Sequence, residues 1–209
     1  MYQNISGIIL SGGKSTRMGE NKSLLKIGDK TAIERIVDLM AGLFPKLILS
    51  ANTPEEYAFL KLDTVQDIHV HAGPLAGIHA GLIKSTSEKN FVISCDMQLM
   101  NEEAIKFLVD YDTDRQITIA KADGFFQQLA GVYHKSCLPE IEDILTNSKI
   151  EESRATDQKK RGCSVFKLVQ TFEAEIIDAE TQMPGYKPGT FFNMNKPHEF
   201  DEIRKLIDS

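Results

Sequence analysis

The sequence lacks several features that would assign it to a specialised class. It has no tryptophan, and its three cysteines, Cys95, Cys137 and Cys163, are far apart and follow no C-x-x-C spacing. An odd number of dispersed cysteines fits neither a zinc knuckle nor a disulfide framework and indicates a reducing compartment. No stretch approaches the roughly 20 apolar residues that span a bilayer, and no basic segment precedes an apolar one at the N-terminus. We therefore expect a cytoplasmic protein that does not use a membrane.

Positive charge is also scarce. The chain has 24 Lys and Arg against 30 Asp and Glu, and its net charge is -6. No general basic field is available for nucleic acid, so any anion must be bound by a local site. The one basic run, DQKKR at 157–161, has no interleaved aromatic residues for base stacking, which favours a solvated loop. We expect no nucleic-acid partner.

The length of 209 residues and a hydrophobic content of 42% are sufficient for one core. We predict a single domain over residues 1–209, with no linker or internal repeat. Residues 147–162 combine dense mixed charge with no helical stripe, which predicts an exposed, mobile loop.

Apolar runs of strand length alternate with segments of helical period. Thr31 and Glu34 form a capping box before one amphipathic segment, and Asn101 can cap another. This alternation predicts an α/β fold with an open, mostly parallel sheet, helices on both faces and ligands at the carboxyl ends of the strands. The expected strands are 5–10, 46–50, 64–67, 91–96, 116–120 and 128–133; the expected helices are 31–44, a short piece after Pro54, 75–85 and one that begins at Asn101.

A glycine loop, LSGGKSTRMGENK at 10–22, follows the first predicted strand. It is not a P-loop, because Gly13 stands where the lysine is required, and it lacks the third glycine of the dinucleotide fingerprint. Adjacent glycines nevertheless allow a close approach of backbone N–H groups to an anion. Arg17 and Lys22 can add positive charge, so the loop is predicted to hold phosphates.

The extended loop LSGGKSTRMGENKSLLKIGDK resembles the signature of nucleotidyltransferases that join an NTP to a phosphorylated acceptor. Three further segments resemble one branch, the molybdenum cofactor guanylyltransferases. They are HAGPLAGIHAGL at 71–82, FVISCDMQLM at 91–100 and FFNMNKPHEF at 191–200. The motifs follow the family's order over nearly the whole chain.

The resemblance implies a Rossmann-like nucleotidyltransferase fold and transfer of GMP from GTP to the terminal phosphate of molybdopterin, with Mg²⁺ as cofactor. Proteins of molybdenum cofactor biosynthesis, or recipient molybdoenzymes, are the implied protein partners. The implied site residues are Leu10, Ser11, Gly12 and Gly13 on the guanine nucleotide, Arg17 and Lys22 on phosphates, Asn52 and Asp67 on base or ribose, Asp96 on Mg²⁺, and Asn193 and Asn195 on the acceptor.

Several of these residues also have simpler explanations. Asn52 and Asp67 are common turn formers, and Asn195 can be a helix N-cap. Cys95 is expected to be a small buried apolar residue, and His69 and His71, on one strand-like face, to be ordinary polar residues.

The chain departs from the family at Gln98 and near Gln128, where proline is usual, which affects acceptor positioning. The alternative functions are a cytidylyltransferase acting on molybdopterin, a sugar- or polyol-phosphate nucleotidyltransferase, and a nucleotide-binding regulator without turnover.

Overall fold

The computed structural model describes residues 1–12, 21–154, 164–194 and 199–200. Within them, seven strands form one sheet in the order β5-β4-β1-β6-β8-β7-β9, and a two-stranded hairpin joins β2 to β3. The strands are β1 (Ile5–Leu10), β2 (Lys26–Ile27), β3 (Lys30–Thr31), β4 (Lys46–Ser50), β5 (Asp63–Val65), β6 (Lys89–Ser94), β7 (Ile117–Ala122), β8 (Phe125–His134) and β9 (Glu175–Asp178).

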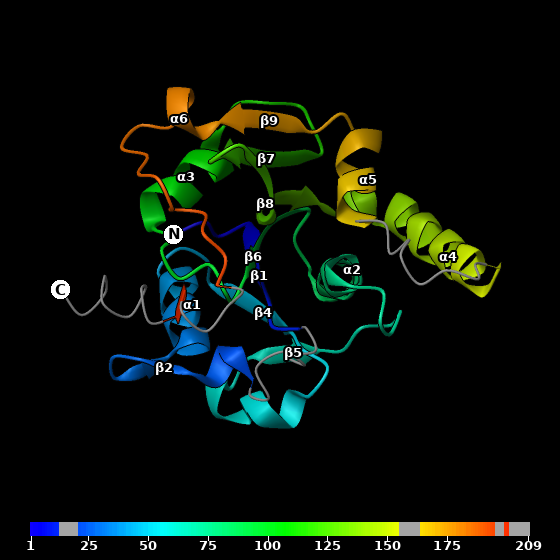
Figure 1. The fold of residues 1–209 in the computed structure, drawn as a ribbon, viewed down its shortest axis with the longest axis horizontal. Helices are drawn as coiled ribbons and strands as arrows, with labels where there is room; N and C mark the ends of the chain where they lie inside the picture. The colour runs from blue at the N-terminus through cyan, green and yellow to red at the C-terminus, as the bar shows by residue number, and fades with distance from the viewer. Residues whose placement is uncertain (13–20, 155–163, 195–198, 201–209) are drawn as a thin grey trace.

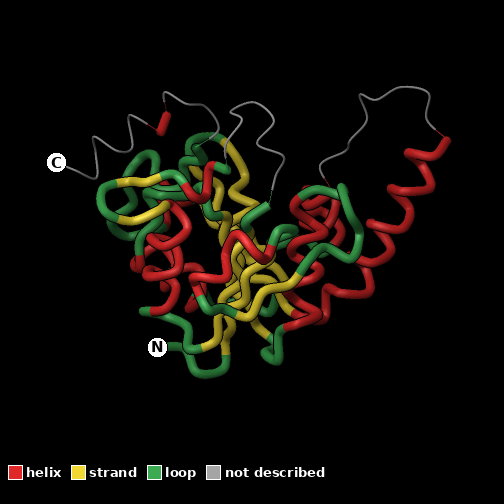
Figure 2. The backbone as a smooth tube through the Cα atoms, turned by 90° about the horizontal axis from the view of Figure 1, so that it is seen from below, coloured by secondary structure: helices red, strands yellow, loops and turns green. Residues whose placement is uncertain are grey.

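Helices cover both faces of this sheet, as Figures 1 and 2 show. They are α1 (Ala32–Ala41), α2 (Pro74–Lys84), α3 (Glu102–Asp110), α4 (Leu138–Arg154), α5 (Ser164–Thr171) and α6 (Ala179–Gln182), with short 3-10 helices η1 (Lys22–Leu24), η2 (Pro54–Leu60) and η3 (Lys135–Cys137). The predicted α/β class with a mostly parallel sheet is confirmed, since β8 alone runs antiparallel to its neighbours β6 and β7 within the large sheet. None of the helices among the described residues has the length and apolar character needed to cross a membrane.

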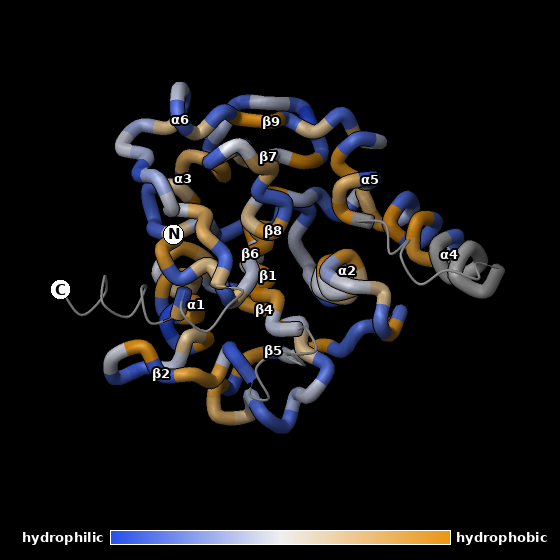
Figure 3. Tube along the Cα trace, in the orientation of Figure 1, coloured by the Kyte–Doolittle hydropathy of each residue, from blue (hydrophilic) through white to orange (hydrophobic). Residues whose placement is uncertain are grey.

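The apolar strands alternate their side chains between two cores. Ile9 packs with α1 and α3 on one face, whereas Ile8 packs with α2, α4 and α5 on the other. Both isoleucines are fully buried, as expected for a strand covered on both faces. Figure 3 shows hydrophilic segments mainly in the outer loops.

The helix caps match the sequence. Thr31 and Glu34 form the predicted capping box, and the Asn101 side chain accepts a hydrogen bond from the Ala104 N–H. Because a cap depends on residues three apart, it is readable from the chain alone.

The prediction of a loop at 147–162 is wrong for its first half. Helix α4 continues to Arg154, and residues 155–163 lie outside the described part of the chain. The charged segment extends a helix that is already anchored through Ile141, Ile144 and Leu145, so tertiary packing overrides the missing apolar stripe. The predicted elements also lack strands β2, β3 and β9, helices α4, α5 and α6, and the short helices η1 and η3.

Candidate nucleotide-binding site

The candidate site lies at the carboxyl ends of three adjacent parallel strands, β4, β1 and β6. Backbone hydrogen bonds continue past the strand ends: the Ser11 N–H donates to Ser50 O at 2.8 Å, and the Cys95 N–H donates to Leu10 O at 3.0 Å. The start of the glycine loop is therefore fixed between the two flanking strands. Ligands bind at this edge in open α/β sheets.

The start of the glycine loop offers open backbone. A Cβ placed on Gly12 would meet no atom within 4 Å, so a ligand can approach closely there. Leu10 and Ser11 are buried below it. Gly13 and Arg17, predicted to hold nucleotide and phosphates, lie outside the described residues, as does Asn195.

Tyr57 in η2 anchors the residues on both sides of the glycine loop. Its hydroxyl accepts hydrogen bonds from Ser11 Oγ and Asn21 Nδ2, each at 2.8 Å, and lies 2.8 Å from Ser23 Oγ. Sequence reasoning missed this residue. Ser11 is 46 residues away along the chain, so its contact with Tyr57 leaves no local sequence pattern. The sequence showed only an aromatic residue in a short helical piece.

Asp96 follows β6 and combines burial with an unsatisfied oxygen. Its Oδ1 is buried and accepts no hydrogen bond from the described residues. Burial raises the pKa of this carboxyl, while a hydrogen bond from Ser94 and the charge of Lys22 act in the opposite direction. A buried carboxylate oxygen without a donor is a site that a cation can satisfy.

Lys22 is brought to the same place from another element. Its Nζ donates to Met194 O at 3.4 Å, and the Met194 N–H donates to Asp96 O at 3.1 Å. The structure thus brings together Lys22, Asp96 and the segment that contains Asn193, although they are far apart in the sequence. A carboxylate beside a lysine can bind a metal and a phosphate in the same place.

Asn52 and Asp67 form a second group at the end of β4. The Asn52 Nδ2 donates to Asp67 Oδ2 at 2.7 Å, and its Oδ1 accepts from the Asp67 N–H at 2.9 Å. Burial raises the pKa of Asp67, and the Asn52 hydrogen bond opposes this. These two hydrogen bonds fix the orientation of both side chains. Asp67 lies two residues beyond β5 rather than at its end.

Gly77 allows helix α2 to approach this second group. A Cβ on Gly77 would lie 3.0 Å from Ser50 Oγ, 3.3 Å from Leu10 Cδ2 and 3.7 Å from Asp67 Oδ1. Gly77, the second glycine of the GPLAG segment, therefore allows close packing of α2 against β1 and β4. Since β1 lies between β4 and β6, the Asn52 group and the Asp96 group follow strands that are two strand spacings, about 10 Å, apart.

Gln98, which replaces the family's usual proline, ties the turn after β6 to helix α1. Its Nε2 donates to Cys95 O at 2.7 Å and to Ala32 O at 2.9 Å. A proline could make neither bond. In this chain the two hydrogen bonds of Gln98, rather than a proline ring, restrict the turn. At Gln128, the backbone carbonyl accepts from the Tyr133 hydroxyl at 2.6 Å.

Cys95 has no features of a nucleophile. Burial raises the pKa of its thiol to about 12, and the nearby Asp96 carboxyl acts in the same direction. The thiol is therefore neutral near pH 7, in agreement with the structural role expected from the sequence.

Comparison with known proteins gives a consistent result. The MobA-like NTP transferase domain matches residues 7–161. A protein of Carboxydothermus hydrogenoformans named probable molybdenum cofactor guanylyltransferase is 40% identical over 98% of both chains. The crystal structure of molybdopterin-guanine dinucleotide biosynthesis protein A from Archaeoglobus fulgidus covers 97% of this chain and 98% of its own, with a TM-score of 0.78 and 19% identity. Rv0371C from Mycobacterium tuberculosis, solved in complex with manganese, covers 100% of each chain with a TM-score of 0.59 and 17% identity.

Proposed function

Because this chain belongs to the MobA-like NTP transferase family, we propose that it transfers GMP from GTP to the terminal phosphate of molybdenum-molybdopterin. The products are the molybdopterin guanine dinucleotide cofactor and pyrophosphate. The name of the relative at 40% identity supports this substrate pair. The observation that carries the proposal is the convergence of Lys22, Asp96 and the 193–194 segment at the edge where the glycine loop begins.

The chemistry requires positioning more than proton transfer. The acceptor phosphate is already anionic near neutral pH and attacks the α-phosphorus of GTP, while pyrophosphate leaves from the opposite side. The backbone from Leu10 to Gly13 would hold the nucleotide, and Arg17 and Lys22 would neutralise charge that grows on the leaving group. Asn52 and Asp67, fixed by their mutual hydrogen bonds, would contact base or ribose.

A divalent cation fits Asp96. The buried Oδ1 without a hydrogen-bond donor is the type of oxygen that Mg²⁺ accepts as a ligand, and burial alone disfavours the charged carboxylate. When bound, Mg²⁺ neutralises phosphate oxygens and favours the in-line displacement. The positive charge of Lys22, beside Asp96, would attract the same phosphates.

The acceptor would lie toward the C-terminal segment, with Asn193 and Asn195 on the pterin side. Met194 is buried, and its backbone joins this segment to both Asp96 and Lys22, so acceptor and nucleotide would share one edge. We also propose that the enzyme works in the cytoplasm, where molybdenum cofactor biosynthesis proteins or recipient molybdoenzymes would supply its acceptor or receive its product.

The test is turnover with a panel of substrates. The protein is incubated with Mg²⁺, molybdopterin and GTP, CTP, ATP or UTP separately, and pyrophosphate and dinucleotide are both measured. We expect product with GTP alone. Product with CTP alone indicates a cytidylyltransferase, and turnover with a sugar phosphate but not with molybdopterin indicates the sugar-phosphate alternative. Tight GTP binding without pyrophosphate release under all conditions would identify a regulator and contradict the proposal.

A further inference from the structure

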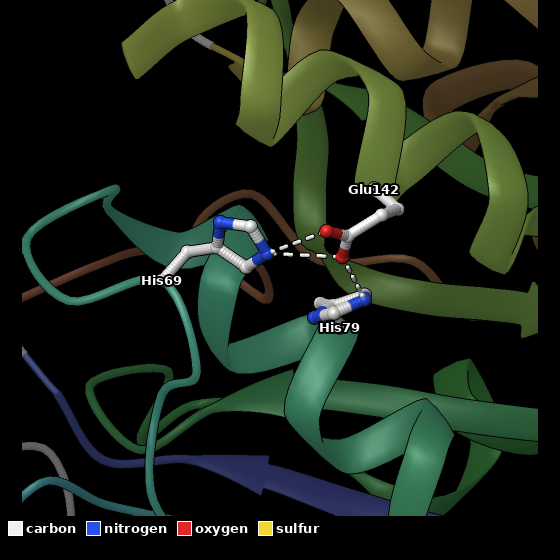
Figure 4. A group of neighbouring side chains, drawn as sticks. All are labelled: His69, His79 and Glu142. Carbon is white, nitrogen blue, oxygen red and sulfur yellow. Dashed lines mark hydrogen bonds and ion pairs between the residues drawn. The ribbon is translucent and has the colours of Figure 1, made fainter.

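Three side chains outside the nucleotide-binding edge converge from three different elements. His69 lies between β5 and α2, His79 lies on α2, and Glu142 lies on α4 (Figure 4). Glu142 Oε2 is 2.9 Å from His69 Nε2 and 3.0 Å from His79 Nε2. The three atoms all lie within 4.8 Å of one another. The sequence interpretation of His69 as an ordinary polar residue is therefore incomplete, since its partners come from 10 and 73 residues away along the chain.

Both histidines are buried. His69 is 7% exposed and His79 is 3% exposed; burial lowers the pKa of His79, and the charge of Glu142 acts in the opposite direction. Their rings meet edge to face at 73° with centroids 5.4 Å apart, and both Nε2 atoms point at the same carboxylate. Neutral imidazole is the form that coordinates a metal.

The other nitrogen of each ring has no partner among the described residues. Both Nδ1 atoms are buried, and with a metal on Nε2 each would carry the ring proton, so a buried water would have to accept it. The two rings also share one carboxylate, and half of the Glu142 side chain faces solvent. The open side of Glu142 leaves space for a further ligand such as water.

We propose that His69, His79 and Glu142 form a binding site for Zn²⁺ or a similar divalent transition metal. Zinc takes ligands at about 2.0–2.1 Å, so ligand atoms around a tetrahedral ion lie about 3.3 Å apart. The two distances from Glu142 Oε2 to the histidine Nε2 atoms, 2.9 and 3.0 Å, must lengthen by a few tenths of an ångström. Two nitrogens and one oxygen suit zinc, whereas Mg²⁺ prefers oxygen ligands alone. The fourth position faces solvent beside Glu142.

The metal would act as a tether between elements. His69 follows Asp67 by two residues, and the chain then enters α2, whose Gly77 packs beside Asp67. A metal bound here would fix the 66–73 segment against both α2 and α4. It would stabilise the fold independently of whether the proposed guanylyl transfer is correct.

The test is metal binding to the full chain after chelator treatment. Wild type is titrated with Zn²⁺ by calorimetry and with Co²⁺ by visible absorption, which reports the coordination geometry. We expect one site with a four-coordinate Co²⁺ spectrum, distinct from the proposed Mg²⁺ site at Asp96, and a melting temperature that rises by about 5–10 °C at 100-fold excess over the dissociation constant. Excess Mg²⁺ should not displace Co²⁺ from this site or reduce its spectrum.

Two matched pairs of variants locate the site. Glu142→Gln and His79→Gln should each weaken Zn²⁺ binding by at least tenfold, whereas Asp143→Asn and His71→Asn should leave it unchanged. Asp143 is an exposed carboxylate on the same helix, and His71 is exposed with a positive φ that asparagine tolerates. Because Glu142 is half-exposed, its variant is expected to fold.

Two outcomes would overturn the proposal. One is wild type that neither binds nor is stabilised by Zn²⁺, even if Glu142→Gln lowers its stability; the cluster would then be a hydrogen-bonded contact only. The other is equal Zn²⁺ binding by wild type, Glu142→Gln and His79→Gln, which would place the metal elsewhere. Neither outcome depends on guanylyl transfer, which is measured separately.

Discussion

At the scale of single residues, burial determines the electrostatics of the candidate nucleotide-binding edge. Asp96 and Asp67 both have raised pKa values, and desolvation is the largest cause in each case. A buried carboxylate favours its charged form only when a cation or donors compensate for lost water. Cation binding at Asp96 is therefore expected to release protons when the carboxyl is partly protonated.

Asp96→Asn should separate stability from turnover. Asparagine has nearly the same shape without the buried charge, so the melting temperature should stay the same or rise, while turnover at saturating GTP falls by about 100-fold or more. Asp114→Asn, at an exposed carboxylate, is the control and should change neither quantity. Near-normal Mg²⁺-dependent turnover in a folded Asp96→Asn protein would remove the assignment.

Lys22 and Lys14 should differ in their importance. Lys22 lies beside Asp96, whereas a disguised P-loop would use Lys14 to hold the phosphates. A charge-assisted hydrogen bond contributes roughly 1.5–3 kcal/mol, so Lys22→Ala should lower kcat/KM for GTP by about one to two orders of magnitude. Lys14→Ala should lower it by at most a few-fold. The reverse ranking in folded variants would contradict our interpretation of the loop.

At the scale of elements, the site depends on how closely neighbouring segments approach one another. Gly81 lies against β1, where an added Cβ would be 2.5 Å from Cγ2 of the fully buried Ile8. Gly7 does the same on the other face, where an added Cβ would be 2.7 Å from Met40 Cε. Small residues therefore set the distance between β1 and the helices on both sides.

Gly81→Ala should affect stability, whereas Gly12→Ala should affect substrate binding. Overpacking costs about 1–3 kcal/mol, which outweighs the gain of about 1 kcal/mol in helix propensity at a site this tight, so Gly81→Ala should lower the free energy of unfolding. Gly12→Ala meets no neighbour and should leave stability unchanged but raise KM for GTP several-fold. Urea unfolding and steady-state kinetics measure the two effects. Equal destabilisation by both variants would contradict the packing account.

The hydroxyl of Tyr57 should hold the ends of the glycine loop together. Tyr57→Phe removes the acceptor of the buried Ser11 hydroxyl, which among the described residues keeps only its contact with the Cys95 thiol, and this should cost about 1–3 kcal/mol of stability. KM for GTP should rise more than kcat falls, because the nucleotide must then order the loop. Tyr111→Phe, at the C-terminal end of α3, is the control for removing a tyrosine hydroxyl away from the glycine loop. An unchanged KM would show that the anchor does not support binding.

At the scale of the whole molecule, two hydrophobic cores lie on opposite faces of one sheet, and each contains or contacts a cysteine with a protonated thiol. Cys95 contacts the core of α1 and α3, whereas Cys137 belongs to the core of α2, α4 and α5. Burial raises the pKa of both thiols to about 12. Both cores therefore respond to alkaline pH in the same direction.

Stability should fall at alkaline pH. The unfolded thiols ionise near their ordinary pKa of about 8.5, while the folded thiols stay protonated until about pH 12, so the free energy of unfolding should decrease as pH rises between these values. In a Cys163→Ser background, alkylation at pH 8 should be roughly 1,000-fold slower in native than in unfolded protein. Rapid native alkylation, or constant stability from pH 8 to 11, would contradict this expectation.

The sequence by itself determined the features that depend on neighbours along the chain. The alternation of strand and helix, the Thr31 and Asn101 caps, and a glycine loop after the first strand all follow from periods and spacings of a few residues. Together they predicted the fold class and the edge at which a ligand would bind. Four motifs in the same order as in the family then indicated which family the chain resembles.

Only the tertiary structure decided which distant residues meet. It placed β8 antiparallel between β6 and β7, extended α4 to Arg154, made Tyr57 the anchor of the loop, and joined His69 and His79 to Glu142. Such contacts depend on how complete elements pack around a shared core, and no local period encodes a partner that lies tens of residues away.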